Sequence, residues 1–344
     1  MKAMMLTGIR QMEMREVPDP VLSDPHDVKV RLLVLGICGS DIHYYVSGRI
    51  GSQIVSYPFT VGHECAGVVV ETGSAVTRVK KDDIIAVEPA MWCGTCEQCL
   101  AGRHHTCRRL RFLGCPGQAE GALSEYIVMP ENSCFPLPAN LNPDHGAISE
   151  PLSIGIYSVK KAGDTGNSDI AILGYGPIGM SVMLAAKSQG ASSIYVTDMI
   201  DRRLEIADKE KASWTGNPSK EDIVKKIIGS KPLGLDIVFE CCGKQEAVDQ
   251  AVELLKPGGK LVIVGIPGFD RWALDVDKTR RKEISIQFIR RQLNCVDDSI
   301  RMMSEGTIDI SNMATHRFPF EKTKEAFDLV DGYHDGVMKA MIDF

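Results

Sequence analysis

The sequence predicts an α/β protein in two parts, a mainly β first half and a doubly wound parallel sheet. Three observations support this fold class. Apolar residues in roughly the first 150 positions follow a period near two, with glycine and proline turns between short runs. From about residue 156, apolar strands alternate with helices in a βαβα order. The chain has 344 residues, a length that favours two domains.

The expected elements follow this division. In the first half we expect short strands with irregular loops between them, at residues 27–35, 66–71, 83–87 and 124–129. In the second half we expect strands at 168–173, 193–197, 236–239, 260–264 and 284–288, and helices at 178–190, 202–209 and 245–255. These later strands are apolar throughout, as in a parallel sheet covered on both faces. A helix over 296–304 then precedes a polar C-terminal stretch.

Composition narrows the class of protein. Hydrophobic residues make up 44% and charged residues 24% of the chain, which are ordinary globular values. A formal net charge of −6 argues against a nucleic-acid binder with a broad basic face. The apolar runs are far shorter than the ~20 residues that cross a bilayer, and the first ten residues form no secretory signal. We therefore expect a cytoplasmic protein that acts on a small molecule, with no membrane or nucleic-acid partner.

A glycine motif after the strand at 168–173 predicts a dinucleotide site. Its residues are Gly174, Tyr175, Gly176, Pro177, Ile178 and Gly179. In a G-x-G-x-x-G motif the first glycine makes a tight turn, the second admits a pyrophosphate and the third lets helix and strand pack closely. The anion then lies on the unpaired N–H groups of the helix N-terminus.

An acidic residue at the end of the next strand completes this pattern. Asp198 lies 198 − 179 = 19 residues after the last glycine, where such a residue accepts hydrogen bonds from the adenosine ribose. A carboxylate there would repel a 2′-phosphate, so we expect NAD rather than NADP. Arg202 and Arg203 leave this choice open, because arginines can accept that phosphate.

A group of four cysteines predicts a structural zinc site. The cysteines are Cys93, Cys96, Cys99 and Cys107. Cysteines stay reduced in the cytoplasm, so a cluster indicates metal ligands rather than disulfides. Four thiolates close a tetrahedral zinc site and leave no position for water. Arginines nearby also suggest a zinc-finger contact with DNA, but the acidic balance favours a solvated loop.

Further motifs place metal-ligand residue types in glycine-rich loops. These are GICGSDIH at 36–43, VGHECAG at 61–67 and SEPLS at 149–153. Together with the cysteine loop and LGYGPIG at 173–179, and in this order, they resemble the zinc-dependent medium-chain dehydrogenases over essentially the whole chain. The sequence is most similar to the sorbitol (polyol) dehydrogenases, because of HYYVSGRIG at 43–51, the glutamate at position 150, and THRFPFEKTKEAFDL at 315–329.

The resemblance implies a domain arrangement and an assembly. A GroES-like catalytic domain would comprise residues 1–154 and 289–344, with a Rossmann NAD-binding domain at 155–288 between them. A homotetramer or dimer is the expectation for this family.

The resemblance also implies a catalytic zinc. Cys38 and His63 would hold it, with Glu64 as third ligand and Glu150 ligating directly or through water. Three protein ligands leave a position for water or a substrate oxygen, as a catalytic zinc requires. Zinc lowers the pKa of the bound hydroxyl, and hydride then passes from the alcohol carbon to the nicotinamide.

Other site residues also come from the resemblance. Ser40 and His43 match the positions of a proton relay, while Tyr44 or Tyr45 and Arg291 would contact the substrate. Residues 288–294 depart from the Phe-Arg-Tyr pattern of animal sorbitol dehydrogenases, since Gln292 follows Arg291 where that pattern has tyrosine. Sorbitol itself is therefore not implied.

The expected reaction is oxidation of a secondary alcohol of a polyol or sugar-derived substrate to a ketone, with NAD. A neutral polyol is favoured over an acid by a small margin. Two enzymatic alternatives stay open, a zinc-dependent L-threonine 3-dehydrogenase and a sugar-acid (aldonate) dehydrogenase. A protein without enzymatic activity, an NAD-binding zinc scaffold, is the alternative of a different class.

Overall fold

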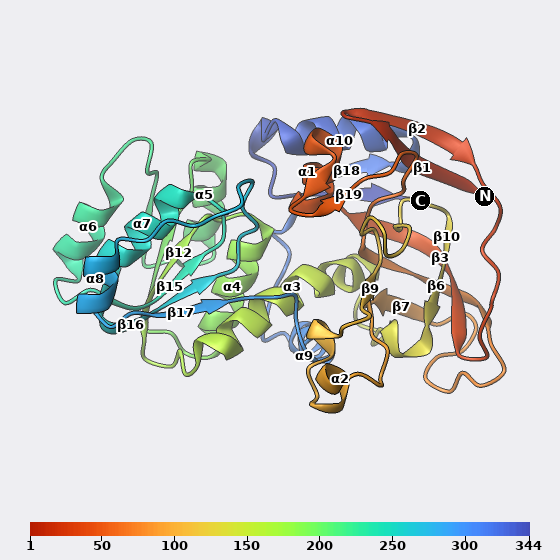
Figure 1. Ribbon diagram of the computed structural model, residues 1–344, viewed down its shortest axis with the longest axis horizontal. Helices are drawn as coiled ribbons and strands as arrows, with labels where there is room; N and C mark the ends of the chain where they lie inside the picture. The colour runs from red at the N-terminus through yellow and green to blue at the C-terminus, as the bar shows by residue number, and fades with distance from the viewer. The chain divides into compact units, whose positions relative to one another are not determined.

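The chain forms two compact units, as described by a computed structural model of all 344 residues. Unit 1 comprises residues 1–150 and 296–344, and unit 2 comprises residues 151–295. The chain therefore leaves the first unit once and returns to it, so the red and the deep blue segments in Figure 1 belong to the same unit. Sequence analysis placed these two boundaries at 154/155 and 288/289.

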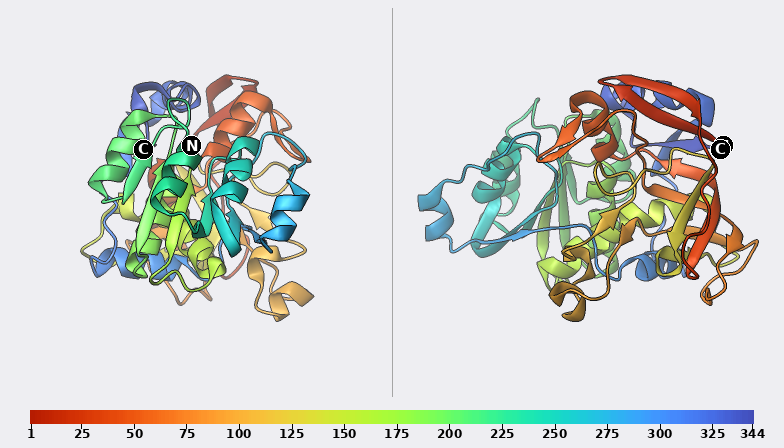
Figure 2. Two further views of the ribbon diagram at one scale, coloured as in Figure 1. Left: turned by 90° about the vertical axis from the view of Figure 1, so that its left-hand side faces the viewer. Right: turned by 45° about the vertical axis from the view of Figure 1, so that its right-hand side comes forward.

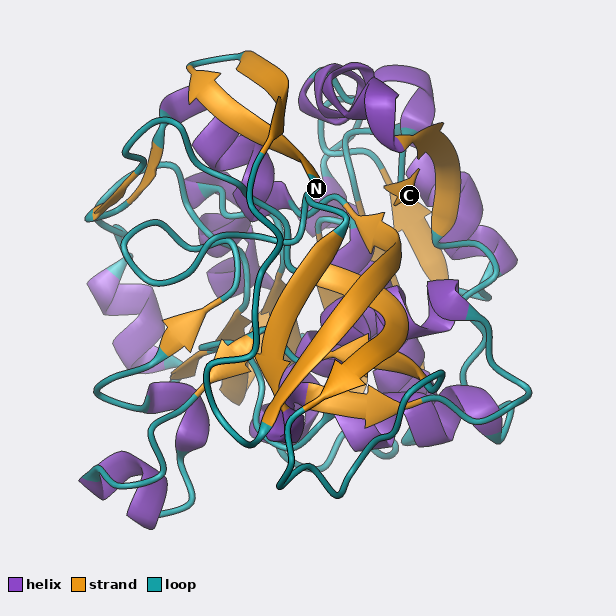
Figure 3. Cartoon of the chain, turned by 90° about the vertical axis from the view of Figure 1, so that its right-hand side faces the viewer, coloured by secondary structure: helices purple, strands orange, loops and turns teal.

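Unit 1 is built on a seven-stranded sheet, which faces the viewer in Figure 3. The strands run in the order β11-β7-β6-β3-β19-β18, and β10 also pairs with β3. Their bounds are β3 Asp27–Gly36, β6 Glu64–Thr72, β7 Ile84–Val87, β10 Tyr126–Pro130, β11 Cys134–Pro136, β18 Ala314–Pro319 and β19 Lys339–Asp343. In β3, Val28, Val30 and Leu32 are buried while Arg31 is exposed, which is the period of two expected of a strand with one core face.

The C-terminal segment completes this sheet. The apolar pattern alone indicated only a polar stretch after residue 304 and missed β18, α10 and β19, although the family resemblance had placed residues 289–344 in the same domain as the first part of the chain. Strand β19 pairs antiparallel with β3, with Met341 opposite Gly36, and helix α10 (Thr323–Asp331) lies between β18 and β19 in the chain. The pattern was missed because β19 is only five residues long and includes a buried lysine, Lys339.

The remaining elements of unit 1 are short, with one exception. They are the hairpin β1 (Lys2–Gly8) and β2 (Gln11–Glu16), the ribbons β4 (Arg49–Ile50) with β5 (Gln53–Ile54) and β8 (Ala90–Met91) with β9 (Arg111–Phe112), and helices α1 (Gly39–Ser47), α2 (Glu97–Leu100) and α9 (Val296–Ser304). The exception is α3 (Pro143–Ala162), a 20-residue helix that begins in unit 1 and continues into unit 2, and that sequence analysis missed because glycines and Pro151 interrupt its pattern. No helix is both long and apolar enough to cross a membrane.

Unit 2 confirms the predicted doubly wound sheet. Its six strands run in the order β14-β13-β12-β15-β16-β17 and all neighbouring pairs are parallel. The strands are β12 Asp169–Leu173, β13 Ser193–Thr197, β14 Trp214–Gly216, β15 Leu235–Glu240, β16 Leu255–Ile263 and β17 Ser285–Phe288. Helices α4 (Pro177–Ser188), α5 (Asp201–Lys209), α6 (Ile223–Ser230), α7 (Gln245–Leu254) and α8 (Val276–Arg281) complete the unit, and Figure 2 shows helices on either side of the strands. The strand order reverses at β12, the position at which such sheets bind nucleotides.

Tyr45 holds α1 against α10 in the core of unit 1. Its side chain is fully buried, its ring meets Phe327 edge-on at 5.4 Å, and its hydroxyl donates to Asp328 Oδ1 at 2.6 Å. Of the two tyrosines considered for substrate contact, Tyr45 is therefore committed to packing.

Tyr45→Phe should lower the free energy of unfolding by about 1 kcal/mol, because one hydrogen bond to a carboxylate is lost while the ring contact is kept. Urea unfolding measures this change. The kinetic constants of the variant should match those of the unmodified protein. Reduced activity at unchanged stability would instead place Tyr45 at the substrate.

Candidate functional site

The glycine motif of unit 2 has the strand, turn and helix that a nucleotide site needs. Gly174 follows β12 with φ +95°, a left-handed conformation that favours glycine, and α4 begins at Pro177. A Cβ on Gly179 would lie 2.1 Å from the carbonyl oxygen of Gly174. Only glycine therefore lets the first turn of α4 sit directly on the strand end, where its free N–H groups can meet an anion.

Asp198 is fixed beside this turn. It directly follows β13, its Oδ2 accepts from the N–H of Tyr175 at 2.6 Å, and its Oδ1 accepts from the N–H of Ile200 at 2.8 Å. The guanidinium of Arg203 lies 3.9 Å from Oδ2, and both side chains are buried. Each carboxylate oxygen has a second lone pair, so the group can accept further hydrogen bonds from ribose hydroxyls.

Glu240 is a buried carboxylate in the same unit that sequence analysis did not identify. Its Oε1 accepts from the N–H groups of Cys242 and Gly243 at 2.8 and 2.6 Å, and burial raises its pKa. A Cβ on Gly174 would lie 2.7 Å from Cys242 Cβ. Glu240 therefore fixes the turn that packs against the glycine motif.

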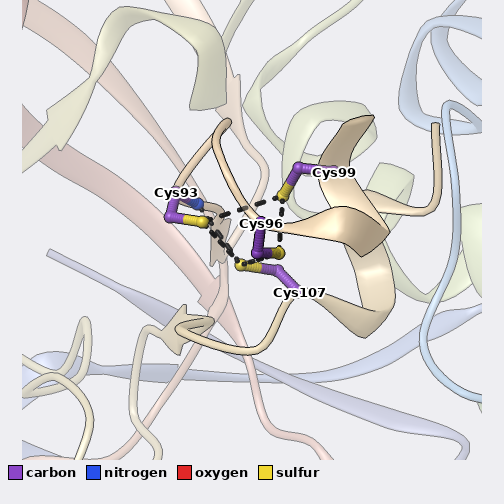
Figure 4. A group of neighbouring side chains, drawn as sticks. All are labelled: Cys93, Cys96, Cys99 and Cys107. Atoms are coloured by element: carbon purple, nitrogen blue, oxygen red, sulfur yellow. Dashed lines mark hydrogen bonds between the residues drawn. The ribbon is translucent and has the colours of Figure 1, made fainter. Parts of the chain in front are cut away.

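The four cysteines of unit 1 converge on one point (Figure 4). The sulfur–sulfur distances are 3.4 Å for Cys93–Cys107, 3.6 Å for Cys96–Cys99, 3.8 Å for Cys96–Cys107 and 4.0 Å for Cys93–Cys99. A tetrahedron with zinc–sulfur bonds of about 2.3 Å has edges of about 3.8 Å. The donor set and its spacing therefore fit a zinc ion. A short helix, α2, lies within this segment, where sequence analysis expected only a loop.

The local backbone prepares two of these thiols for a metal. The N–H of Thr95 lowers the pKa of Cys93 to about 5, and the N–H of Arg108 lowers that of Cys96. Burial raises the pKa of Cys99 to about 12. Metal binding at this cluster must therefore displace a proton from Cys99 at neutral pH.

A second cluster joins Cys38, His63 and Glu64. Their ligand atoms all lie within 4.8 Å of one another. Cys38 caps α1 directly after β3, and Glu64 opens β6. The antiparallel register sets Gly36 opposite Glu64, which brings the end of one strand to the start of the other.

Glu64 is also the partner of a buried lysine. Its Oε2 accepts from Lys339 Nζ, and both side chains are 1% exposed. Burial acts to lower the pKa of Lys339, but the neighbouring charges of Glu64 and Cys38 outweigh it and raise that pKa. Glu150 lies on α3 and is buried, with 6% exposure. It is not among the residues whose ligand atoms lie within 4.8 Å of one another.

Asp41 is a further residue of this cluster that sequence analysis missed. It is fully buried, and its carboxylate accepts from the N–H groups of Cys38 and Gly62, each at 3.1 Å. Its Oδ1 also lies 3.4 Å from Nδ1 of His63. A carboxylate at Nδ1 fixes the imidazole tautomer and leaves Nε2 for a metal. The signal was an aspartate three residues after the capping position of a helix.

Burial and neighbouring charges also have opposite effects on the pKa of His63. Burial acts to lower its pKa, but the charges of Asp41 and Cys38 outweigh this effect and raise that pKa well above the ordinary value. The carboxylate of Asp41 therefore stabilises the protonated form of the buried His63 imidazole.

The other candidate residues are distributed over both units. Ser40, His43 and Tyr44 occupy α1 at spacings of three and four residues, so they share one face of the helix. Tyr44 is buried, and its hydroxyl donates to Gln53 at 3.2 Å. Arg291 follows β17 with φ +53° and lies in unit 2, not in the returning part of unit 1.

Comparison with known proteins agrees with this description. A model of the alcohol dehydrogenase GroES-like domain matches residues 24–139, and a zinc-binding dehydrogenase model matches residues 177–305. The chain is 36% identical to a sorbitol dehydrogenase of Bacillus subtilis, covering 99% of this chain and 97% of the other. It is 35% identical to an L-idonate 5-dehydrogenase of Vitis vinifera, covering 94% and 89%.

Solved structures that superimpose on this chain over nearly its whole length are also oxidoreductases. An Escherichia coli oxidoreductase of unknown specificity superimposes with a TM-score of 0.94 at 31% identity, covering 99% of this chain and 98% of the other. A Sinorhizobium meliloti zinc-binding dehydrogenase bound to NADP superimposes with a TM-score of 0.90 at 30% identity, covering 100% and 99%.

A doubly wound α/β unit with a glycine turn, together with a β unit in which cysteine, histidine and glutamate side chains could hold a metal ion, is the arrangement of a zinc-binding dehydrogenase. The chain belongs to the zinc-dependent medium-chain alcohol dehydrogenase family, and within it is similar to sorbitol dehydrogenases. The family resemblance noted from the sequence motifs is thereby confirmed.

Asp41→Asn should weaken metal binding at the Cys38 cluster by about 10- to 100-fold, because the amide cannot accept all three hydrogen bonds that the carboxylate receives. After dialysis against a chelator, the unmodified protein should retain two zinc ions per chain and the variant one, in the four-cysteine site. Elemental analysis measures both.

The matched control is Asp27→Asn, which changes a carboxylate that accepts from loop N–H groups at the opposite end of β3 from Cys38. It should retain both zinc ions. Two retained zinc ions and full activity in Asp41→Asn would show that Asp41 does not orient a ligand.

Proposed function

We propose that this protein oxidises a secondary alcohol of a polyol or sugar-derived substrate to a ketone, with zinc and NAD. The observation that carries this proposal is the Cys38, His63 and Glu64 cluster, whose ligand atoms lie within 4.8 Å of one another. Relatives named for sorbitol, D-xylulose and L-idonate support a sugar-derived alcohol as the substrate.

The residues of unit 1 divide the work between metal binding and proton transfer. Cys38 and His63 would hold a catalytic zinc, with Glu64 as third ligand because it lies in the cluster and Glu150 does not. Zinc there supplies a Lewis acid that lowers the pKa of the substrate hydroxyl. Ser40 and His43, on the same face of α1 as Tyr44, would carry the released proton toward solvent. The four-cysteine cluster would hold a second, structural zinc.

The residues of unit 2 bind the hydride acceptor. Gly174, Gly176 and Gly179 let the pyrophosphate approach the N-terminus of α4, while Asp198 would accept from the ribose hydroxyls. The nicotinamide cofactor supplies the redox chemistry. Arg203 already faces the Asp198 carboxylate, so this arginine balances that charge rather than offering a site for a 2′-phosphate. This arrangement favours NAD.

A sugar acid is the second candidate substrate. The relative from Vitis vinifera is named for L-idonate, a carboxylate, and Arg291 could pair with such a group through two parallel hydrogen bonds. The same guanidinium can donate to two neighbouring hydroxyls, so Arg291 is compatible with either class.

The purified protein with NAD should turn over neutral polyols with a higher kcat/KM than aldonates, inositols or L-threonine. NADH absorbance follows the reaction, and Cys38→Ala provides the inactive control because it removes a metal ligand. A higher kcat/KM for L-threonine or for an aldonate would replace the polyol assignment. Absence of turnover with every substrate would favour the scaffold alternative.

Asp198→Ala should raise the KM for NAD by about 10-fold, because two hydrogen bonds to the ribose are lost. It should also reduce the preference for NAD over NADP, because the carboxylate no longer repels the 2′-phosphate of NADP. Initial rates with each cofactor measure the ratio. Asp201→Ala, which removes an exposed carboxylate paired with Lys220, should leave the ratio unchanged. An unmodified enzyme with a higher kcat/KM for NADP would contradict the role given to Asp198.

A further inference from the structure

Three polar side chains from separate segments of unit 1 meet in a cluster that the mechanism above does not use. Gln53 Nε2 donates to Sγ of Cys115 at 2.8 Å, and Gln53 Oε1 accepts from the Tyr44 hydroxyl at 3.2 Å. The same hydroxyl lies 3.8 Å from Cys115 Sγ. Tyr44 and Cys115 are each 4% exposed, whereas Gln53 is half-buried. The two buried side chains therefore fix the amide of the third.

One anchor of Gln53 belongs to a segment that carries a metal-ligand candidate, and the other lies next to a residue that packs against such a segment. Tyr44 lies on α1, whose capping residue is Cys38, and six helical residues correspond to about 9 Å along the axis. Cys115 follows Gly114, at which a Cβ would lie 2.7 Å from the carbonyl oxygen of Gly62, the residue before His63. Gln53 therefore links the helix that Cys38 caps to a segment that packs against the residue before His63.

The amide of Gln53 retains hydrogen-bonding capacity. A glutamine side chain has two N–H donors and an oxygen with two lone pairs. One donor is used by Cys115 and one lone pair by Tyr44. One donor and one lone pair remain, and a hydroxyl group, which both donates and accepts, matches this pair.

We propose that Gln53, held by Cys115 and Tyr44, binds a substrate hydroxyl away from the carbon that is oxidised, and so determines specificity for polyols. This inference rests on the proposed function and deepens it. None of the three side chains is a lysine, an arginine or a carboxylate, so this part of the site offers hydrogen bonds that suit a neutral hydroxyl. A carboxylate group would call for a charged donor.

The test compares a polyol with a simple secondary alcohol, butan-2-ol, which has no second hydroxyl. Gln53→Leu keeps the size of the side chain and removes its polar atoms. It should lower kcat/KM for the polyol by about 10- to 100-fold, because a substrate hydroxyl loses its partner on leaving water. The value for butan-2-ol should stay the same. Gln11→Leu, at an exposed glutamine on β2, is the control and should change neither.

Two variants of Cys115 test the support of the amide. Cys115→Ser retains a polar partner and should keep the preference for the polyol, whereas Cys115→Ala removes it and should reduce that preference. Thermal unfolding of all variants establishes that they are folded.

The outcomes separate this inference from the proposed function. If the unmodified enzyme does not oxidise polyols, the proposed function fails, and the inference fails with it. If it oxidises polyols but Gln53→Leu lowers kcat/KM for both alcohols equally, or for neither, Gln53 does not determine specificity while the proposed function stands.

Discussion

The antiparallel pairing of β3 with β6 and with β19 is the constraint on which the cluster of Cys38, His63 and Glu64 depends. Gly36 lies opposite Glu64 on one side and opposite Met341 on the other. Successive side chains of a strand point to opposite faces, so a slip of one residue would turn the Glu64 or Lys339 side chain away. A Cβ on Gly36 would lie 2.6 Å from Glu64 Oε2 and 3.1 Å from Lys339 Cδ. The glycine leaves the space in which the two charges meet.

This register concentrates charge where water is excluded. A buried ion is costly unless it is paired and hydrogen-bonded, and Lys339 meets this condition through Glu64 and the carbonyl oxygen of Ile37 at 3.2 Å. A zinc held by a thiolate and a carboxylate would have both of its positive charges offset. The positive charge of Lys339 opposes that offset, so the cluster with a zinc bound would keep a net positive charge.

The sequence predicted those parts of the fold whose signal is local. The strands and helices that were predicted in unit 2 lie within a few residues of their expected positions, because each is a regular apolar run that ends in a turn, whereas β14, α6 and α8 were not predicted. The exception is β16, which begins at Leu255 instead of 260. Helix α3 could not be predicted in this way, since Gly146, Pro151 and Gly155 interrupt its pattern. Strand β19 has no pattern of its own and is defined by its pairing with β3.

The residues of the candidate site also fall into those with a local sequence signal and those without one. Cysteine spacing and the glycine motif are local, and both led to residues that the structure brings together. Lys339 and Glu64 are 275 residues apart in the chain, so no local pattern could join them. Asp41 had a local signal, its capping position, but its bond to the N–H of Gly62 required the tertiary structure.

The fold determines the positions of the metal-ligand candidates more strictly than it determines the position of Gln53. Cys38, His63 and Glu64 follow from strand register, from a glycine without space for a side chain, and from charges that must remain paired. Gln53 lies on a two-residue strand of a two-stranded ribbon, and its amide is held by two side-chain hydrogen bonds. A substitution at Gln53 leaves the sheet and its buried ion pair intact. The geometry of the Cys38, His63 and Glu64 cluster is therefore set by the sheet of unit 1, while the proposed choice of alcohol depends on a side chain held by two hydrogen bonds to buried residues.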